Sequence, residues 1–457
     1  PSPLAPRPSP LAPRPSTLDL PCPSTPDSAP SRLGRLKRAP GSLPATALVI
    51  ASMIGTGVFT SLGFQLPDLT SGPQILFLWL LGGGIALSGA LCYAAVAGAL
   101  PRSGGEHHFL TELYHPALGF MAGVLSAVVG FAAPTAITAL AFGEYLAKAV
   151  PGVPVQASAA LVILAGTAAH AISSRASAGV QLAATGLKLL LIVLFVVATI
   201  LVPGAGDIRW TPDSAADFDA ILKPAFAISL FFVFYSYSGW NAAVYGLEEW
   251  DQPAVTVRRA LVAGTLIVTV LYLALNAAFL HAAPVDALRG QVAVGEISAR
   301  HLFGAPAARP IAALFALGLF ASISALLWAG PRVLAAIGRS VPAFRLLRSG
   351  GGAPVVALAV QALLALGFVF AADFRQLVTY TQTGLALCSF LTVLGVFLLR
   401  DRIKVGRLLV PAVLFLAMTG FVVVRSVAAE PLPTLAGLAT AAVIAVAGLF
   451  LTYRSIP

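Results

Sequence analysis

The sequence predicts an all-α polytopic membrane protein with twelve transmembrane helices. Of its 457 residues, 58% are hydrophobic and only 10% are charged, whereas a soluble globular protein carries about 25% charged residues. Twelve long apolar runs follow residue 43, and a helix needs roughly 18 such residues to cross a bilayer. Barrel strands would instead give runs of about 10 residues with alternating polarity. The runs are 43–66, 69–101, 113–143, 149–174, 176–206, 224–247, 260–285, 310–331, 349–372, 376–399, 408–424 and 431–453.

The segment before the first run differs in kind from the rest. Residues 1–7 read Pro-Ser-Pro-Leu-Ala-Pro-Arg, and residues 8–14 repeat them. A Pro-rich segment buries too little apolar surface to fold and contains no apolar core of a signal peptide. We expect residues 1–42 to be a disordered Pro-rich tail and residues 43–457 to form one membrane domain.

The basic residues report orientation in the membrane. With the N-terminus placed inside, the inside segments hold 19 Lys and Arg residues and the outside segments hold 8. This bias is typical of cytoplasmic loops, so both termini are predicted to be cytoplasmic in a multi-pass protein of the cell (plasma or inner) membrane. The formal net charge of +10 therefore requires no nucleic-acid partner.

The three cysteines give no support for a disulfide or a metal site. Cys22 lies in the tail, whereas Cys92 and Cys388 lie within apolar runs. None falls in an outside loop, and no spacing brings the three together. No metal and no cofactor are predicted.

Two of the twelve runs contain polar interruptions. The first reads Ala-Ser-Met-Ile-Gly-Thr-Gly-Val-Phe over 51–59, and the sixth reads Phe-Tyr-Ser-Tyr-Ser-Gly-Trp-Asn over 234–241. The two interruptions correspond if runs 1–5 and 6–10 are repeats of opposite orientation. Paired breaks of this kind point to a transporter's substrate site.

A broken helix exposes backbone groups that can bind charge. After Gly55-Thr56-Gly57, a new half-helix would present free N–H groups and a positive dipole to a carboxylate. The sixth helix would end near Tyr235 and present carbonyl oxygens to an ammonium group. Together the breaks suit a zwitterionic α-amino acid. The alternative is that these glycines serve only close helix packing.

Several motifs, in order, resemble one family. They are Gly55-Thr56-Gly57-Val58-Phe59, Pro101-Arg102-Ser103-Gly104-Gly105-Glu106, and Tyr237-Ser238-Gly239-Trp240-Asn241 followed by Glu248-Glu249 and Pro253. They resemble the amino acid–polyamine–organocation (APC) superfamily, in particular its L-type amino acid transporter branch. The similarity covers the first ten runs.

The resemblance implies a LeuT-type fold of five plus five inverted repeats with two extra C-terminal helices. The repeats would span 43–206 and 224–399, and the extra helices 408–453. Amides of Thr56, Gly57 and Val58 would bind the carboxylate. Carbonyls of Met53, Tyr235 and Ser238 would bind the amino group, the Tyr235 ring would cover the substrate, and Trp240 and Asn241 would line the side-chain pocket. The predicted substrate-binding set is Met53, Ile54, Gly55, Thr56, Gly57, Val58, Tyr235, Ser236, Tyr237, Ser238, Gly239, Trp240 and Asn241.

Lys188 is the one Lys, Arg, Asp or Glu within a predicted span. Such a residue is costly in a membrane and faces protein or a cavity. In related transporters a lysine here replaces a bound sodium ion and reaches carbonyls of the first helix. Lys188 is predicted to be either a proton carrier or a permanently charged brace.

Other polar residues carry weaker expectations. Glu248 and Glu249 are expected to pair with Arg258 or Arg259 as an inner gate. The adjacent His107 and His108 lack a third ligand and are expected to be interfacial rather than metal-binding.

The leading functional hypothesis is secondary transport of neutral L-amino acids, by exchange or proton symport, through alternating access. No carboxylate lies in a predicted span to hold a cationic side chain, which favours neutral substrates. The alternatives are a cationic amino acid or polyamine permease and a transport-dead amino acid sensor on the same fold. A channel would need rings of polar or charged groups along its spans, and a membrane enzyme would need a catalytic cluster within them. The sequence shows neither, so both classes are disfavoured. No disulfide-linked heavy-chain partner is expected because no outside cysteine exists.

Overall fold

The computed structural model describes residues 41–172, 177–213, 217, 219, 223–348 and 354–453. The predicted disordered tail lies outside these residues, apart from its last two positions. The described part is helical and contains no β-strand, only an isolated bridge between Ser71 and Arg209.

The predicted helical, multi-pass class is confirmed. Eight helices of the described chain are long and apolar enough to cross a membrane, and a bent pair makes a ninth. The first half comprises α1 (Ser42–Met53), α2 (Gly57–Gln65), α3 (Gly72–Ala99), α4 (Glu106–Leu113), α5 (Pro116–Leu125), the π-helix η1 (Ser126–Ala132), α6 (Ala133–Ala149), α7 (Val155–Ile172) and α8 (Ser177–Leu201). The second half comprises α10 (Pro224–Tyr237), η2 (Ala242–Val244), η3 (Leu247–Glu249), α11 (Pro253–Ala282), α12 (Val285–Leu288), α13 (Val294–Phe303), α14 (Ala305–Ser340), η4 (Pro342–Leu347), α15 (Val355–Ala371), α16 (Phe374–Leu394), η5 (Gly395–Phe397), η6 (Val405–Arg407), α17 (Leu409–Ala429) and α18 (Pro431–Tyr453).

The first predicted span is interrupted where the sequence indicates. Helix α1 ends at Met53, α2 begins at Gly57, and the two are bent by 41°. The residue after α1, Ile54, has a ψ of 80°, which takes its peptide out of the helical path. The two glycines at the break have no side chains, and the residues on either side of the break are apolar. The break therefore lies within a hydrophobic run.

The sixth predicted span differs from the expected pair of half-helices. Helix α10 continues to Tyr237, two residues beyond the predicted end, and the chain then turns through Ser238 and Gly239. Gly239 has a φ of +100°, which glycine adopts without steric cost. The following residues form only the short 3₁₀ turns η2 and η3. The predicted run 224–247 is therefore helical only in its first part.

Prolines reshape two further spans. The segment from Pro116 to Ala149 is one apolar span with η1 in its middle, and Pro134 lies just after this π-helix. A proline has no N–H to donate into the helix, which favours such local rewinding. Helix α14 accommodates Pro310 and Pro331 internally and runs well beyond the predicted 310–331.

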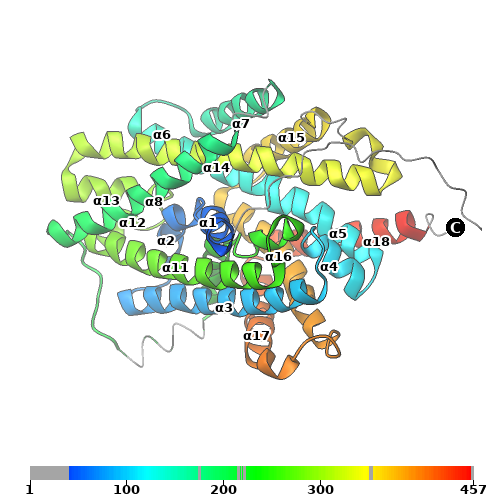
Figure 1. Ribbon diagram of the computed structural model, residues 1–457. Coiled ribbons are helices and arrows are strands. Elements are labelled where there is room, and N and C mark those ends of the chain that lie inside the picture. Colours follow the sequence, from blue (N-terminus) through cyan, green and yellow to red (C-terminus); the bar gives the residue numbers. More distant parts are fainter. Residues whose placement is uncertain are drawn as a thin grey trace, which may run out of the picture. The chain divides into compact units, whose positions relative to one another are not determined.

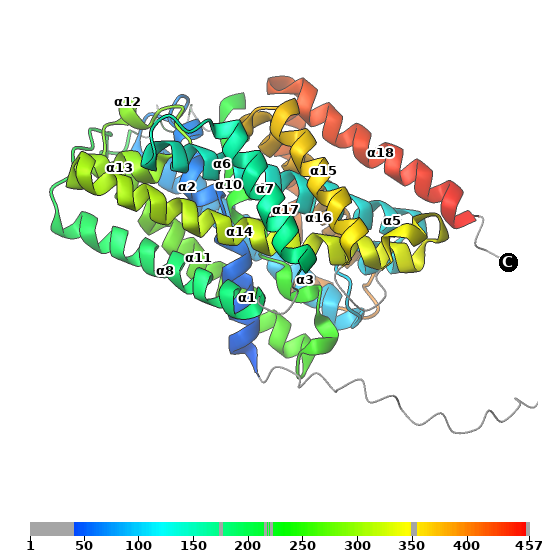
Figure 2. The ribbon, with the colours of Figure 1, turned by 90° about the horizontal axis from the view of Figure 1, so that it is seen from above.

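Helices of the two halves pack against each other. Helix α3 runs beside α11, and α6 beside α14 (Figure 1). Helix α8 lies along α14 (Figure 2). Around the breaks, α2 contacts α10, and α1 contacts α11 and η2. The interrupted segments are thereby enclosed by continuous helices.

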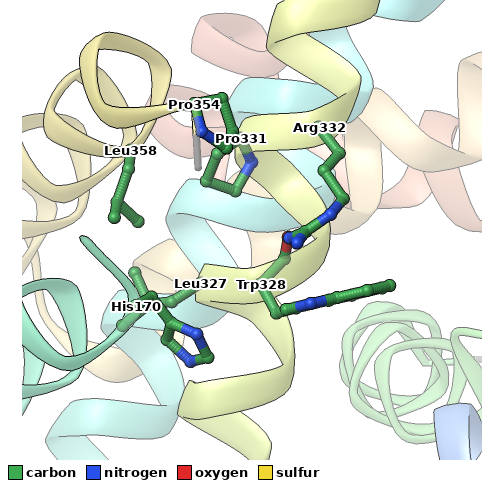
Figure 3. A pocket seen from close by; sticks show the side chains of 7 residues that line it. All are labelled: His170, Leu327, Trp328, Pro331, Arg332, Pro354 and Leu358. Atoms are coloured by element: carbon green, nitrogen blue, oxygen red, sulfur yellow. The ribbon is translucent and has the colours of Figure 1, made fainter. Parts of the chain in front are cut away.

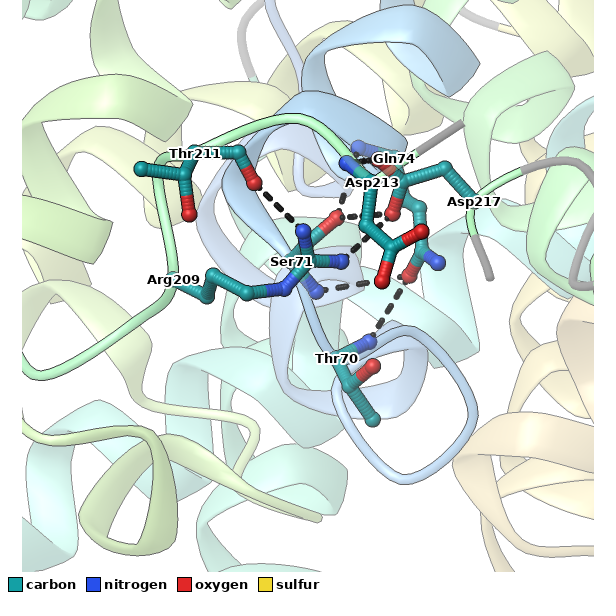
Figure 4. A network of polar contacts seen from close by, with 7 residues as sticks. All are labelled: Thr70, Ser71, Gln74, Arg209, Thr211, Asp213 and Asp217. Carbon is teal, nitrogen blue, oxygen red and sulfur yellow. Dashed lines mark hydrogen bonds and ion pairs between the residues drawn. The ribbon is translucent and has the colours of Figure 1, made fainter. Parts of the chain in front are cut away.

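A polar network ties the connection after α8 to the start of α3 (Figure 4). Arg209 pairs with Asp217 at 2.7 Å, and the Ser71 hydroxyl donates to the same carboxylate at 2.9 Å. Ser71 also caps α3 through a reciprocal capping box with Gln74. The backbone N–H of Asp213, with Ser71 and Arg209, lowers the pKa of Asp217 from its ordinary value. This connection is thus held in place by an ionised carboxylate.

Candidate functional site

The two breaks lie directly against each other. A Cβ placed on Gly57 would come within 2.5 Å of the Cα of Ser236. A Cβ placed on Gly239 would come within 2.6 Å of the carbonyl oxygen of Ser52. Each glycine therefore allows one interrupted span to approach the backbone of the other, as the packing alternative for these residues requires.

The Tyr272 side chain joins the two breaks and was not singled out by the sequence. Its hydroxyl lies 2.6 Å from the carbonyl oxygen of Met53 and 2.9 Å from that of Ser236. A phenol has one proton, so it donates to one of these carbonyls at a time. Tyr272 is fully buried on α11, and a tyrosine in an apolar helix gives no sequence signal for this contact.

The first break combines unpaired amides with free space. The opening amides of α2 have no carbonyl of the preceding turn to bond within the helix. Thr56, at the start of α2, shares a hydrogen bond of 2.7 Å with the hydroxyl of Thr138 on α6. A Cβ on Gly55 would meet only the Met53 oxygen, 3.9 Å away. The break therefore offers donors and room beside Gly55.

The oxygens around the second break lie within hydrogen-bond distance of donors from Ser238. The Ser238 hydroxyl lies 3.1 Å from the carbonyl oxygen of Phe234 and 3.2 Å from Oε1 of Gln382 on α16. The Ser238 amide turns back to the Tyr235 carbonyl at 3.1 Å. Gln382 is 4% exposed and is a second residue that sequence reasoning missed. A glutamine in the interior of the apolar run 376–399 could have signalled it.

The aromatic residues of the second break are held by stacking. Trp240 packs edge-on against Tyr93, with ring centroids 4.7 Å apart, and also contacts Phe415. The Tyr237 hydroxyl donates to the carbonyl of Trp79 at 3.1 Å. The Tyr235 ring is 8% exposed beside the first break. The predicted pocket residues are therefore fixed in place by α3 and α17.

Lys188 reaches the first break. Its Nζ lies 3.3 Å from the carbonyl oxygen of Ile54, one of the residues between α1 and α2, and 2.5 Å from the Ser322 hydroxyl on α14. The side chain is 4% exposed. Lys188 thus links α8, α14 and the interrupted span by hydrogen bonds to neutral oxygens. Its role as proton carrier or brace stays a prediction.

The expected inner-gate ion pairs are absent. Glu248, Glu249, Arg258 and Arg259 are all exposed, and within the described chain no ion pair joins the two glutamates to the two arginines. Helix α11 begins at Pro253, after the two glutamates, and carries both arginines.

A different acidic side chain closes this region. Glu106 is 4% exposed and accepts hydrogen bonds from Tyr93, Asn241 and Tyr245 at 2.9, 2.6 and 2.5 Å. Asn241 therefore binds Glu106 rather than facing only the predicted pocket. Glu106 is the last residue of the motif at 101–106, which indicates no role for it.

The two adjacent histidines and a small pocket both lie apart from the breaks. Nδ1 of His107 bonds the Gly119 carbonyl oxygen at 2.8 Å, and no group of three metal-ligating side chains occurs in the part of the chain that the structure describes. A small pocket opens between α7, α14 and α15 (Figure 3). It is lined by His170, Leu327, Trp328, Pro331, Arg332, Pro354 and Leu358.

The sequence matches known transporters over most of its length. A family model described as amino acid permease matches residues 41–452. The chain is 26% identical to b(0,+)-type amino acid transporter 1 of Mus musculus over 87% of this chain and 84% of the relative. It is 28% identical to Asc-type amino acid transporter 1 of Mus musculus over 87% and 78%. It is 27% identical to the large neutral amino acids transporter small subunit 2 of Oryctolagus cuniculus over 88% and 78%.

Proposed function

The chain belongs to the amino acid permease family and is an amino acid transporter of the membrane; on that premise we propose that it carries neutral L-amino acids by alternating access about its two broken helices. The observation that carries this proposal is that the two breaks meet at Gly57 and Ser236 while the first break keeps open space beside Gly55. The backbone ends at this point supply both donors and acceptors without a charged residue of their own.

The proposed site recognises the backbone of an amino acid. The first amides of α2, at Thr56, Gly57 and Val58, would bind the carboxylate with the help of the helix dipole. Carbonyls of Met53, Tyr235 and Ser238 would bind the ammonium group. The two groups of an α-amino acid thus contact opposite helix ends, as expected for a discontinuous-helix site.

The surrounding residues favour a neutral side chain. Trp240 and Asn241 adjoin the second break, and Asn241 bonds Glu106. The Glu106 carboxylate already accepts hydrogen bonds from three donors of the protein, so it is not free of partners beside the proposed pocket. One relative is named a large neutral amino acids transporter subunit, which supports the same preference.

The finer architecture is part of the proposal. The eight long helices and the bent pair would make up the predicted twelve spans together with three shorter apolar helices, Gly186–Leu201, Pro224–Tyr237 and Val355–Ala371. The pairs α3–α11 and α6–α14 would be equivalent elements of repeats at 43–206 and 224–399. The basic bias of the sequence supports cytoplasmic termini in a cell membrane.

Coupling is proposed to be exchange or proton symport. Lys188 occupies the space between α8, α14 and the first break with a hydrogen-bonded ammonium group, which disfavours a sodium ion there. No disulfide-linked heavy chain is proposed, since the sequence offers no cysteine in an outside connection.

Transport is tested with purified protein in liposomes loaded with unlabelled amino acid. We expect uptake of radiolabelled neutral amino acids to exceed that of arginine, lysine and putrescine, with exchange faster than net uptake. Substrate-dependent thermal stabilisation, which reports binding alone, is measured in parallel. Binding without flux would identify a sensor, and no binding of any neutral amino acid would refute the proposal.

A further inference from the structure

Glu106 is a buried carboxylate held by donors from separate segments. Tyr93 comes from α3, whereas Asn241 and Tyr245 come from the segment that follows the second break. Glu106 itself opens α4, after the connection at 101–105. We call these four residues, Tyr93, Glu106, Asn241 and Tyr245, the Glu106 latch.

The latch contains a charge without an ionic partner. In the described chain no ion pair involves Glu106, and both of its oxygens face donors. Two hydroxyl groups and an amide together can supply three hydrogen bonds to an ionised carboxylate. Hydrogen bonds to a charged acceptor are about twice as strong as neutral ones, so each of the three contacts helps to hold its segment against Glu106.

The backbone around Glu106 is shaped to receive Tyr245. Gly105 has a φ of +56°, and a Cβ there would lie 2.4 Å from the Tyr245 ring. The Gly104 amide donates to the Tyr245 carbonyl at 3.2 Å. Nearby, the Glu248 amide donates to the Ser103 hydroxyl at 3.0 Å. The connection at 101–106 and the segment at 241–248 thus meet along their lengths.

The position of the latch links it to the proposed substrate site. Asn241 directly follows Trp240, and Trp240 packs on the ring of Tyr93. One carboxylate therefore fixes the neighbour of Trp240 and the ring on which it rests. Movement of the segment after the second break, away from α3 and α4, has to break the two hydrogen bonds that Asn241 and Tyr245 donate to Glu106.

We propose that Glu106 is the positioning residue of the closure on this face of the transporter, and that the latch must open before substrate can leave or enter there. This inference rests on the proposed alternating access, but it assigns the closure to one carboxylate rather than to the exposed pairs Glu248–Glu249 and Arg258–Arg259. Substrate release on this face then requires the carboxylate to exchange its Asn241 and Tyr245 donors for water.

A native cysteine reports the state of the latch. Cys388 on α16 is 5% exposed and belongs to a buried cluster with Leu110 of α4, the helix that begins at Glu106. In a Cys22→Ser, Cys92→Ser background it is the one thiol of the chain. Its reaction rate with a charged, membrane-impermeant methanethiosulfonate measures opening, with no substrate added.

The test compares Glu106→Ala and Tyr245→Phe with Glu112→Ala, an exposed glutamate on the same helix. We expect Glu106→Ala to raise the labelling rate most. Tyr245→Phe removes one hydrogen bond to a charged group, which corresponds to about a tenfold or larger shift of the closed–open equilibrium. Glu112→Ala should label like the parent, and only reagent on the face carrying residues 101–106 should react faster.

Several outcomes would overturn the proposal. These are parent-like labelling of a monodisperse Glu106→Ala or Tyr245→Phe protein, an equal increase in Glu112→Ala, or faster labelling from the opposite face. If Glu106→Ala does not fold, Tyr245→Phe decides the question because it keeps the carboxylate and the ring. A failure of the substrate panel leaves this assay intact, so the two proposals fail separately.

Discussion

Gly55 and Gly57 lie two residues apart but have different surroundings. Gly57 lies against Ser236 with no room for a Cβ, whereas Gly55 has open space beside it. The same short motif therefore supplies a packing contact and a gap. The packing alternative accounts for Gly57, and the substrate hypothesis needs the space beside Gly55.

Gly57→Val is expected to abolish transport. A branched side chain would push α2 away from α10, because Ser236 presents its Cα at 2.5 Å from the position of the new Cβ. Uptake in liposomes and thermal stability would both fall. Gly84→Ala on α3, where a Cβ meets nothing within 4 Å, is the matched control. Wild-type uptake by Gly57→Val would contradict the close approach of the two breaks.

Lys188→Ala is expected to weaken transport by about tenfold or more, while Lys148→Ala has little effect. Lys188 is buried and bonds the Ile54 carbonyl at the first break, whereas Lys148 lies half-buried in the last turn of α6. A charged group inside a span is retained where it has a partner or a function. Initial uptake rates of the two variants, at equal reconstituted amounts, give the comparison. Equal effects would remove any special role of Lys188.

At the scale of whole elements, the two interrupted spans are stabilised by uninterrupted neighbours. Helix α11 supplies Tyr272 to both breaks, and α3 supplies the surface on which Trp240 and Tyr237 pack. Irregular backbone is tolerated at membrane depth where protein covers it. The broken spans are thus local exceptions within a framework of continuous helices.

Tyr272→Phe removes only the hydroxyl that joins α11 to the breaks. We expect a loss of about 1–2 kcal/mol in the free energy of unfolding, because a buried carbonyl is left without this donor. A weaker apparent affinity for substrate is also expected, since Met53 lies at the proposed ammonium site. Thermal shift and the KM of uptake measure the two effects. Tyr380→Phe, whose hydroxyl bonds Thr440 at 3.3 Å, should change stability less; the reverse order would count against the prediction.

At the scale of the whole molecule, the number of crossings sets the side on which each connection lies. The connection at 286–304 and the connection at 395–408 are separated by α14, α15 and α16. If all three helices cross the membrane, as we propose, these connections lie on opposite sides of it. The eight basic residues outside and nineteen inside predict which side is cytoplasmic.

Single cysteines in a background without Cys22, Cys92 and Cys388 test this arrangement. Asp286→Cys replaces a side chain that is 86% exposed, and Gly406→Cys has nothing within 4 Å of its Cβ. In intact cells we expect an impermeant maleimide to label position 286 and to label position 406 only after permeabilisation. Labelling of both positions from one side would show that one of the three helices does not cross.

The sequence by itself determined the helical multi-pass class, the positions of both interruptions and the family, because these depend on local composition and on the order of motifs. Apolar run length and paired glycines are properties of single segments, so no tertiary information was needed. The run boundaries were less well determined at Pro331 and after Tyr237, where a proline is tolerated in α14 and the second part of a span forms turns.

Only the tertiary structure decided which side chains meet. Tyr272 and Gln382 join residues more than thirty positions apart, as do the bonds of Glu106 to Asn241 and Tyr245. Nothing in the spacing of Glu106 and Asn241 indicates their contact. The predicted pairing of Glu248 and Glu249 with Arg258 and Arg259 followed from sequence proximity, yet solvent-exposed charges gain little from pairing. The hydrogen-bond donors of a buried carboxylate instead come from the segments that helix packing places beside it. That packing is a property of the whole fold.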